Sequence, residues 1–92
     1  MENTVYFETY SYPKQKELLQ EIYHNAILRE SGLLVEGIQF TSGKIDDSSS
    51  LKLNGVAESF AAFNTFIKEL EEKGILVKSV GYNKEELNSS LC

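Results

Sequence analysis

The strongest constraint on the fold is a pair of stretches with helical spacing of apolar residues, each set between strand-like segments. In both stretches apolar side chains recur in steps of one, three or four, which places them along one side of a helix. Several members of the second stripe are phenylalanines, whose rings we expect to anchor the core. The first stripe contains Leu18, Leu19, Ile22, Tyr23, Ala26 and Ile27, and the second contains Phe60, Phe63, Phe66, Ile67 and Leu70.

Capping and stop residues bound both stretches. Ser59 can cap the second helix, because serine side chains accept hydrogen bonds from the free N–H groups of a first turn. Gly32 and Gly74 follow the apolar stripes, where glycine commonly ends a helix. The sequence therefore predicts helices over about residues 14–29 and 60–73.

Strand-like segments surround these helices. Pro13 separates the first of them from the first helix and suits the opening of a helical turn. The polar loop 41–50 joins the second and third segments as a hairpin with a long tip. The four segments, identified by β-branched and aromatic residues or by alternation, occupy residues 4–10, 33–41, 51–54 and 75–82.

The element order is thus β-α-β-β-α-β, and the chain of 92 residues is long enough for one domain only. Two β-α-β units with right-handed crossovers give an α+β fold, the ferredoxin-like split β-α-β. In this fold a four-stranded antiparallel sheet, in the order 4-1-3-2, carries both helices on one face. We expect this single domain to span residues 1–82, followed by a polar C-terminal tail over residues 83–92.

The charge balance bears on possible partners. Nine Lys and Arg stand against 14 Asp and Glu, a formal net charge of −5, whereas binding to nucleic-acid phosphates depends on clustered cations. RNA binders of this topology stack bases on strand aromatics, and Tyr6, Phe7 and Tyr10 lie in the first strand. The third strand, 51–54, has no aromatic residue to complete such a platform. We expect no nucleic-acid partner.

Few side chains offer catalytic or metal-binding chemistry. His24 and Cys92 are the only histidine and cysteine, and spacing assigns neither of them a partner. Asp46 and Asp47 lack the loop pattern of a calcium site. Arg29 is the only arginine, and it ends the first helix instead of forming a phosphate cradle after the first strand. We therefore predict no enzyme activity, no catalytic, cofactor-binding or metal-binding residues, and no cofactor.

One segment resembles a known family. The sequence SLKLNGVAES at residues 50–59 is similar to a φ-x-φ-x-G-x-A-x-S segment of the PilN-class inner-membrane assembly proteins of type IV pili and type II secretion systems. Gly55, Ala57 and Ser59 are its main anchors, and the likeness extends over roughly residues 14–82. The φφ-x-x-L part of the segment is matched by Phe66, Ile67 and Leu70, preceded by Phe63.

The resemblance implies a non-enzymatic dimerisation or scaffold domain within a membrane-associated pilus-biogenesis or secretion complex. In that family a ferredoxin-like domain, usually ordered α-β-β-α-β-β, follows a short cytoplasmic tail and one membrane helix. The longest apolar run here, 32–35, is far shorter than the about 20 residues of a membrane span, and the N-terminus has no basic region. The expected location is the extracytoplasmic face of the inner membrane, through an anchor in a parent chain, if this is an excised domain, and otherwise the cytoplasm.

The expected partner is a second copy or a protein with a like fold, bound through an exposed strand edge or the open face of the sheet. The first strand would present its side opposite Val5 and Phe7, and the second strand is the predicted outer edge. The candidate contacts are Tyr6, Glu8, Tyr10, Leu34, Glu36, Ile38 and Phe40.

A small-molecule-binding regulatory domain is the alternative. Regulatory modules of the same topology often build their ligand sites from backbone groups at dimer interfaces. No motif in this sequence selects a particular ligand.

Overall fold

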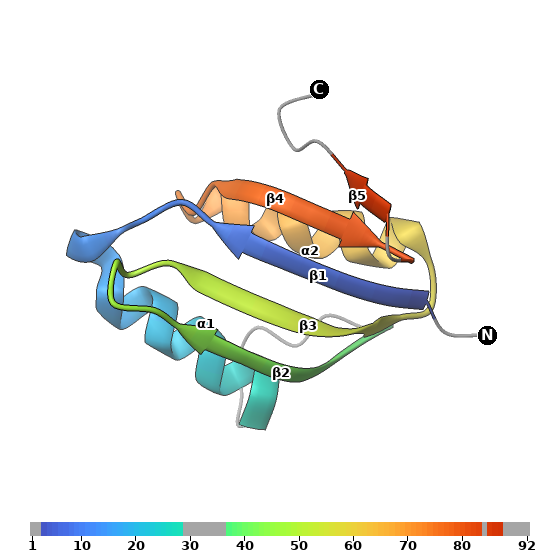
Figure 1. Ribbon diagram of the computed structural model, residues 1–92, viewed down its shortest axis with the longest axis horizontal. Coiled ribbons are helices and arrows are strands. Elements are labelled where there is room, and N and C mark those ends of the chain that lie inside the picture. Colours follow the sequence, from blue (N-terminus) through green and yellow to red (C-terminus); the bar gives the residue numbers. More distant parts are fainter. Residues whose placement is uncertain (1–2, 29–36, 84, 88–92) are drawn as a thin grey trace.

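The computed structural model describes residues 3–28, 37–83 and 85–87 (Figure 1). Two helices and a short 3₁₀ turn alternate with strands in the predicted order, and one further strand follows. The elements are β1 (Asn3–Thr9), the 3₁₀ turn η1 (Pro13–Gln15), α1 (Lys16–Leu28), β2 (Ile38–Ile45), β3 (Leu51–Ala57), α2 (Phe60–Glu72), β4 (Val77–Tyr82) and β5 (Glu85–Leu87).

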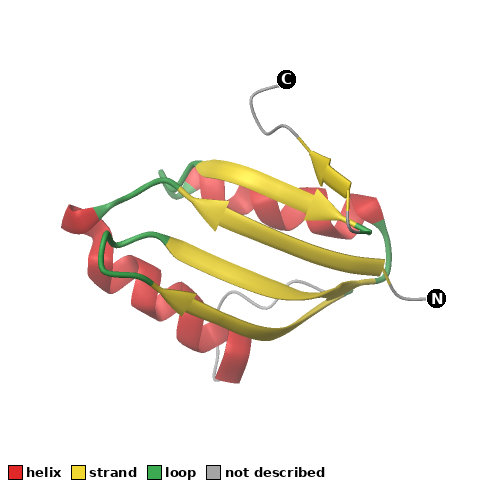
Figure 2. Ribbon diagram, viewed as in Figure 1, coloured by secondary structure: helices red, strands yellow, loops and turns green. Residues whose placement is uncertain are grey.

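The strands form one sheet in the order β2-β3-β1-β4-β5, and every neighbouring pair is antiparallel. Both helices lie against the same face of this sheet, and the other face has no layer over it among the described residues (Figure 2). The prediction of an α+β fold with a four-stranded antiparallel sheet and two helices is confirmed.

The second strand differs from its prediction. Residues 33–36 lie outside the described part of the chain, and β2 continues through residues 41–45, which were expected to be loop. The sequence TSGKI in this stretch has loop composition, but its backbone pairs with β3 as far as Ile45 opposite Leu51. A register shift between Phe40 and Ser42 accommodates one extra residue, as in a β-bulge.

The C-terminal segment also differs. Residues 83–92 were expected to form a polar tail, and three of them, Glu85–Leu87, pair with Val80–Tyr82 as β5. The described part of the sheet therefore has one edge at β2 and the other at β5.

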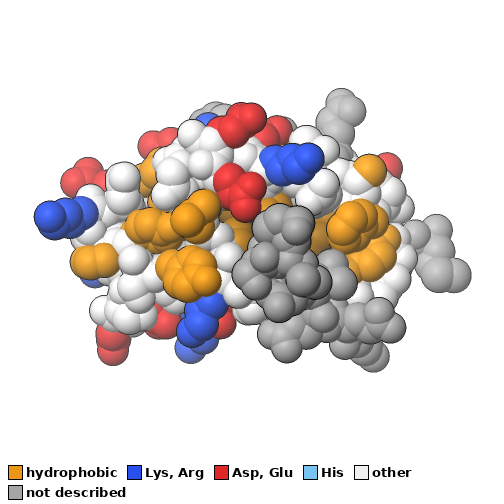
Figure 3. Space-filling model, turned by 90° about the horizontal axis from the view of Figure 1, so that it is seen from above, with side chains coloured by type: hydrophobic (Ala, Val, Ile, Leu, Met, Phe, Trp, Pro, Cys, Tyr) orange, Lys and Arg blue, Asp and Glu red, His pale blue; other side chains and the backbone are white. Residues whose placement is uncertain are grey.

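Viewed from the β4 side, the surface carries hydrophobic side chains in separate groups among charged ones (Figure 3).

The helix signals behave as their chemistry predicts. Ser59 caps α2, because its hydroxyl oxygen accepts a hydrogen bond from the Ala62 N–H at 3.1 Å. Gly74 follows the helix with a φ of 88°, a left-handed conformation that glycine adopts without strain. Pro13 opens η1, and α1 then starts at Lys16. The predicted stop at Gly32 lies outside the described residues.

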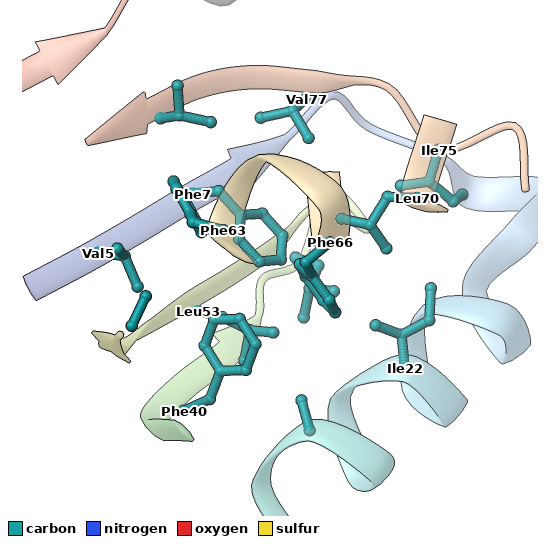
Figure 4. Packing of buried hydrophobic residues seen from close by; sticks show 14 of the residues in the cluster. Val5, Phe7, Ile22, Phe40, Leu53, Phe63, Phe66, Leu70, Ile75 and Val77 are labelled. Atoms are coloured by element: carbon teal, nitrogen blue, oxygen red, sulfur yellow. The ribbon is translucent and has the colours of Figure 1, made fainter. Parts of the chain in front are cut away.

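The core lies between the sheet and the two helices (Figure 4). The rings of Phe7, Phe40 and Phe66 pack together, with centroid separations of 5.9 Å for Phe7–Phe40, 5.6 Å for Phe7–Phe66 and 5.0 Å for Phe40–Phe66. Phe63 is buried as predicted, but Phe60 is 47% exposed and meets Tyr82 edge to face. Phe60 opens α2, so it falls at the margin of the buried stripe.

Candidate functional site

The open face of the sheet is centred on Tyr6 in β1. Val5 and Phe7 face the helices and are buried, so Tyr6 and Glu8 point the other way, as the alternation of the sequence predicted. Tyr6 stands opposite Gly81 of β4, and a Cβ atom at position 81 would overlap the Tyr6 ring. The ring therefore covers the strand backbone at this position, which requires glycine.

Charged side chains cross the open face in one row. Cross-strand pairing places Lys44 of β2 opposite Lys52 of β3, and Lys52 opposite Glu8. The Lys52 Nζ lies 3.8 Å from a carboxylate oxygen of Glu8, so this lysine has a counter-ion. Within the described residues Lys44 has none.

Tyr10, another predicted contact, lies just beyond the end of β1. Its backbone N–H donates to the carbonyl of Leu76 at 3.1 Å, and both side chains are about half exposed. The Leu76 N–H in turn donates to the hydroxyl of Tyr12 at 2.8 Å. Tyr10 is thus accessible, as expected, at the end of the sheet where β1 and β4 are joined by these contacts.

The predicted contacts on β2 have a different character. Phe40 is 7% exposed and packs on Phe7 and Phe66, and Ile38 is half-buried against the same core. Phe40 is therefore a core residue, because its side chain lies on the strand face that the helices cover. Leu34 and Glu36 fall outside the described residues. The exposed side chains of β2 are instead Gln39, Thr41, Ser42 and Lys44.

The backbone of β2 does present groups to its outer edge. The Glu58 N–H donates a hydrogen bond to the Gly37 carbonyl at 2.7 Å, so these two residues form a hydrogen-bonded pair of the ladder between β2 and β3. Hydrogen-bonded pairs alternate along an antiparallel ladder, so Ile38 and Phe40 direct their N–H and C=O groups away from β3.

Beyond the bulge, odd-numbered residues of β2 point their backbone groups outward in place of even-numbered ones. The Asp46 N–H donates to the Ser50 carbonyl at 3.0 Å, which makes Gly43 and Ile45 the residues that point outward. No strand among the described residues pairs with this outer side of β2. The edge thus offers two short sets of main-chain donors and acceptors.

A groove lies between α1 and the end of β2. Gln20, Tyr23 and His24 line it from the helix, and Lys44 and Ile45 line it from the strand, around a volume of about 370 Å³. His24 is exposed and its ring lies 5.7 Å from that of Tyr23. Sequence reasoning missed this groove, because it exists only where β2 extends beside α1 through residues that were expected to be loop.

A smaller hollow of about 190 Å³ lies on the open face. It is lined by Thr4, Val5, Tyr6, Asn54 and Gly81. Gly81, whose backbone the Tyr6 ring approaches closely, forms part of its wall.

Asp46 has a structural role at the tip of the β2–β3 hairpin. One carboxylate oxygen accepts hydrogen bonds from the N–H groups of Ser48 and Ser50 at 3.0 and 3.1 Å, and from the Ser48 hydroxyl at 2.6 Å. The Ser48 hydroxyl and these backbone donors lower the pKa of Asp46 to about 2. The carboxylate thereby closes the turn in which Ser49 adopts a φ of 63°.

Metal-binding groups, membrane-spanning helices and the lone cysteine also bear on the site. No group of three or more histidine, cysteine or acidic side chains in the described part of the chain is placed to hold a metal ion. Neither α1 nor α2, each 13 residues long, is long and apolar enough to cross a membrane, and no other described helix is. Cys92 lies outside the described residues.

Comparisons with known proteins identify no relative. No protein-family model matches the chain. No curated protein and no solved structure matches it significantly.

Proposed function

We propose that this chain is a non-enzymatic protein–protein interaction domain that pairs through the outer edge of β2. The observation that carries this proposal is that β2 is an eight-residue terminal strand whose outer side no described strand covers. Such an edge can accept a strand from another chain through main-chain hydrogen bonds. The partner is a second copy or a protein with a like fold.

The bulge makes this edge selective. Ile38 and Phe40 form one outward-facing set and Gly43 and Ile45 the other, because the register shifts between them. Bulges and lysines on edge strands also discourage indiscriminate pairing. A straight partner strand therefore pairs with one of the two sets, and side-chain contacts decide which.

We further propose that the domain is of the ferredoxin-like split β-α-β type and serves in a membrane-associated pilus or secretion assembly, at the extracytoplasmic face of the inner membrane. Supporting this fold, the four strands expected from the sequence lie in the order β4-β1-β3-β2, with β5 added beyond β4 and both helices on one face. Supporting the family, the segment SLKLNGVAES covers β3 and the cap of α2, where Ser59 caps the helix.

The test removes one outward-facing N–H. Ile38→Pro deletes the N–H of the first residue of β2, a position where proline leaves the ladder with β3 intact. Ile38→Ala is the matched control, because it also shortens the half-buried side chain but keeps the N–H. Association is measured by light scattering and sedimentation equilibrium, alone and with candidate partner domains, after circular dichroism has established that both variants are folded.

We expect association in the native chain and in Ile38→Ala, and its loss or strong weakening in Ile38→Pro. Equal association of the two variants would overturn pairing at the first set of edge groups. Absence of association with any partner would overturn the interaction function itself.

A further inference from the structure

The outward-facing residues of β2 are placed symmetrically about its bulge. Ile38 and Phe40 direct their N–H and C=O groups outward before the bulge, and Gly43 and Ile45 do so after it. Phe40 and Gly43 are equally far in sequence from the midpoint of this eight-residue strand, and so are Ile38 and Ile45. The spacing of the edge groups is therefore the same when it is followed from either end of the strand.

This symmetry favours a second copy of β2 as the strand that fits the whole edge. A regular strand presents backbone groups to one side at every second residue, so it matches the residues before the bulge or those after it. A second copy placed antiparallel meets both sets, because Ile38 falls opposite Ile45 of the second copy and Phe40 opposite Gly43. Each such pair can exchange two main-chain hydrogen bonds.

We propose that the partner at this edge is a second copy of the chain, related by a twofold axis that passes between Thr41 and Ser42 of the two strands. The inference rests on the proposed function and selects one of its two partners, together with the register of pairing. All four outward-facing residues stand opposite buried residues of β3, so they lie on the same face of the sheet and the axis is perpendicular to it. The two sheets then form one continuous sheet, with the helices of both copies on a single face (Figure 2).

The side chains that meet in this register are compatible on both faces. On the helix-covered face Ile38 and Ile45 are half-buried against the core, and pairing sets each beside the other of the second copy. On the open face Gln39 falls opposite Lys44 of the second copy, so its amide oxygen can accept a hydrogen bond from the ammonium group. Isoleucine thus meets isoleucine, and the one charged residue of β2 meets an amide.

Two other antiparallel registers of β2 with itself fit less well. A register centred on Lys44 would set the two copies of this lysine directly opposite each other, which is destabilising. A register centred on Gln39 would use only the two outward-facing residues that precede the bulge. Pairing about the midpoint of β2 uses all four and keeps the lysines apart.

The test places cysteines at two exposed positions that the proposed register brings together. Gln39 and Lys44 lie towards opposite ends of one strand, too far apart for a disulfide within a chain, but opposite each other between copies. The double variant Gln39→Cys/Lys44→Cys, in a Cys92→Ser background, should therefore form a covalent dimer under mild oxidation. It should do so at least about tenfold faster than either single variant, because pairing raises the effective concentration of the two thiols.

Non-reducing gels give the rates, and mass spectrometry of proteolytic fragments identifies the bond between residues 39 and 44. The single variants Gln39→Cys and Lys44→Cys report the other two registers, since each would cross-link to itself only if the strands were centred on its own position. Lys68→Cys, at an exposed position on α2, gives the rate of chance encounters. Circular dichroism establishes that every variant is folded.

The outcomes separate this inference from the proposed function. Cross-linking of a single variant as fast as that of the double variant would overturn the proposed register. If no variant cross-links faster than Lys68→Cys while association with another domain stays sensitive to Ile38→Pro, the second copy is excluded as the partner and edge pairing stands. The proposed function is tested separately, by the effect of Ile38→Pro on association.

Discussion

The two edges of the sheet are built differently. At one edge β4 receives a short strand from its own chain, since Glu85–Leu87 pair with Val80–Tyr82. At the other edge β2 is longer, is interrupted by a bulge and lies beside a groove of unpartnered polar side chains. The chain thus covers part of one edge itself, whereas no described strand covers the other.

The largest expected effect concerns the attachment of β2 to the core. Phe40→Ala should destabilise the fold by about 3 kcal/mol, because a buried ring in contact with Phe7 and Phe66 would be lost. Phe60→Ala, on the exposed end of α2, is the matched control and should cost well under half as much. Urea unfolding measures both values, and similar costs would mean that β2 is not held by its ring contacts.

A second prediction compares two glycines on either side of β1. A Cβ at Gly55 would overlap the backbone of β2 at Gln39 and Phe40, whereas a Cβ at Gly81 would overlap only the Tyr6 side chain. Backbone cannot yield as a side chain can, so Gly55→Ala should destabilise by about 2 kcal/mol and Gly81→Ala by less.

A further variant tests whether the Tyr6 ring is the cause of the cost at Gly81. Tyr6→Ala removes the ring that a Cβ at position 81 would meet. In that background Gly81→Ala should cost less than it does alone, while the cost of Gly55→Ala should stay unchanged. Additive effects for Tyr6 and Gly81 in chemical denaturation would contradict the close approach.

A third prediction concerns the hairpin that carries β2. The pKa of Asp46 lies at about 2 in the folded chain, below its ordinary value of 3.8, so ionised Asp46 stabilises the fold. This contribution is complete above the unfolded-state pKa and is lost as the pH falls through about 2. The melting temperature of the native chain should therefore exceed that of Asp46→Asn at neutral pH, with a gap that closes in acid. A gap that does not depend on pH would contradict the assignment.

The smallest effect is expected on the open face. Glu8 and Lys52 are partly exposed and their charged atoms are 3.8 Å apart, which is the geometry of a weak pair. A double-mutant cycle with Glu8→Gln and Lys52→Gln should give a coupling energy below about 0.5 kcal/mol. A coupling energy several times larger would contradict the description of Glu8 and Lys52 as a weak, solvent-screened pair.

Local signals in the sequence were sufficient for much of the fold. The alternation at Val5 and Phe7, the cap at Ser59 and the stop at Gly74 each depend on nearby residues and were predicted with their roles. The length of β2 was not, because residues 41–45 are polar and include a glycine, and only pairing with β3 makes them a strand. The same holds for β5, whose pairing partner lies on β4.

The candidate site was less accessible to sequence reasoning. Tyr6 and Glu8 are partly exposed as expected, because a period of two decides which face of a strand they occupy, and Tyr10 is exposed just beyond the end of β1. The burial of the Phe40 side chain was not foreseen, since the side that β2 turns to the helices depends on its register with β3, and only the backbone of Phe40 faces the outer edge. The groove joins residues of α1 to residues of β2 and has no counterpart in local spacing.

The bulge in β2 also bears on how the protein behaves at high concentration. A regular strand offers hydrogen-bonding groups to one side at every second residue, but the outward-facing residues here are 38 and 40, then 43 and 45. An incoming straight strand that matches one pair is out of step with the other. Repeated stacking of identical strands, the arrangement found in amyloid fibrils, needs an unbroken period along the whole segment. The irregular step between residues 40 and 43 thus limits any straight strand that pairs there to a short match and opposes growth into a fibre.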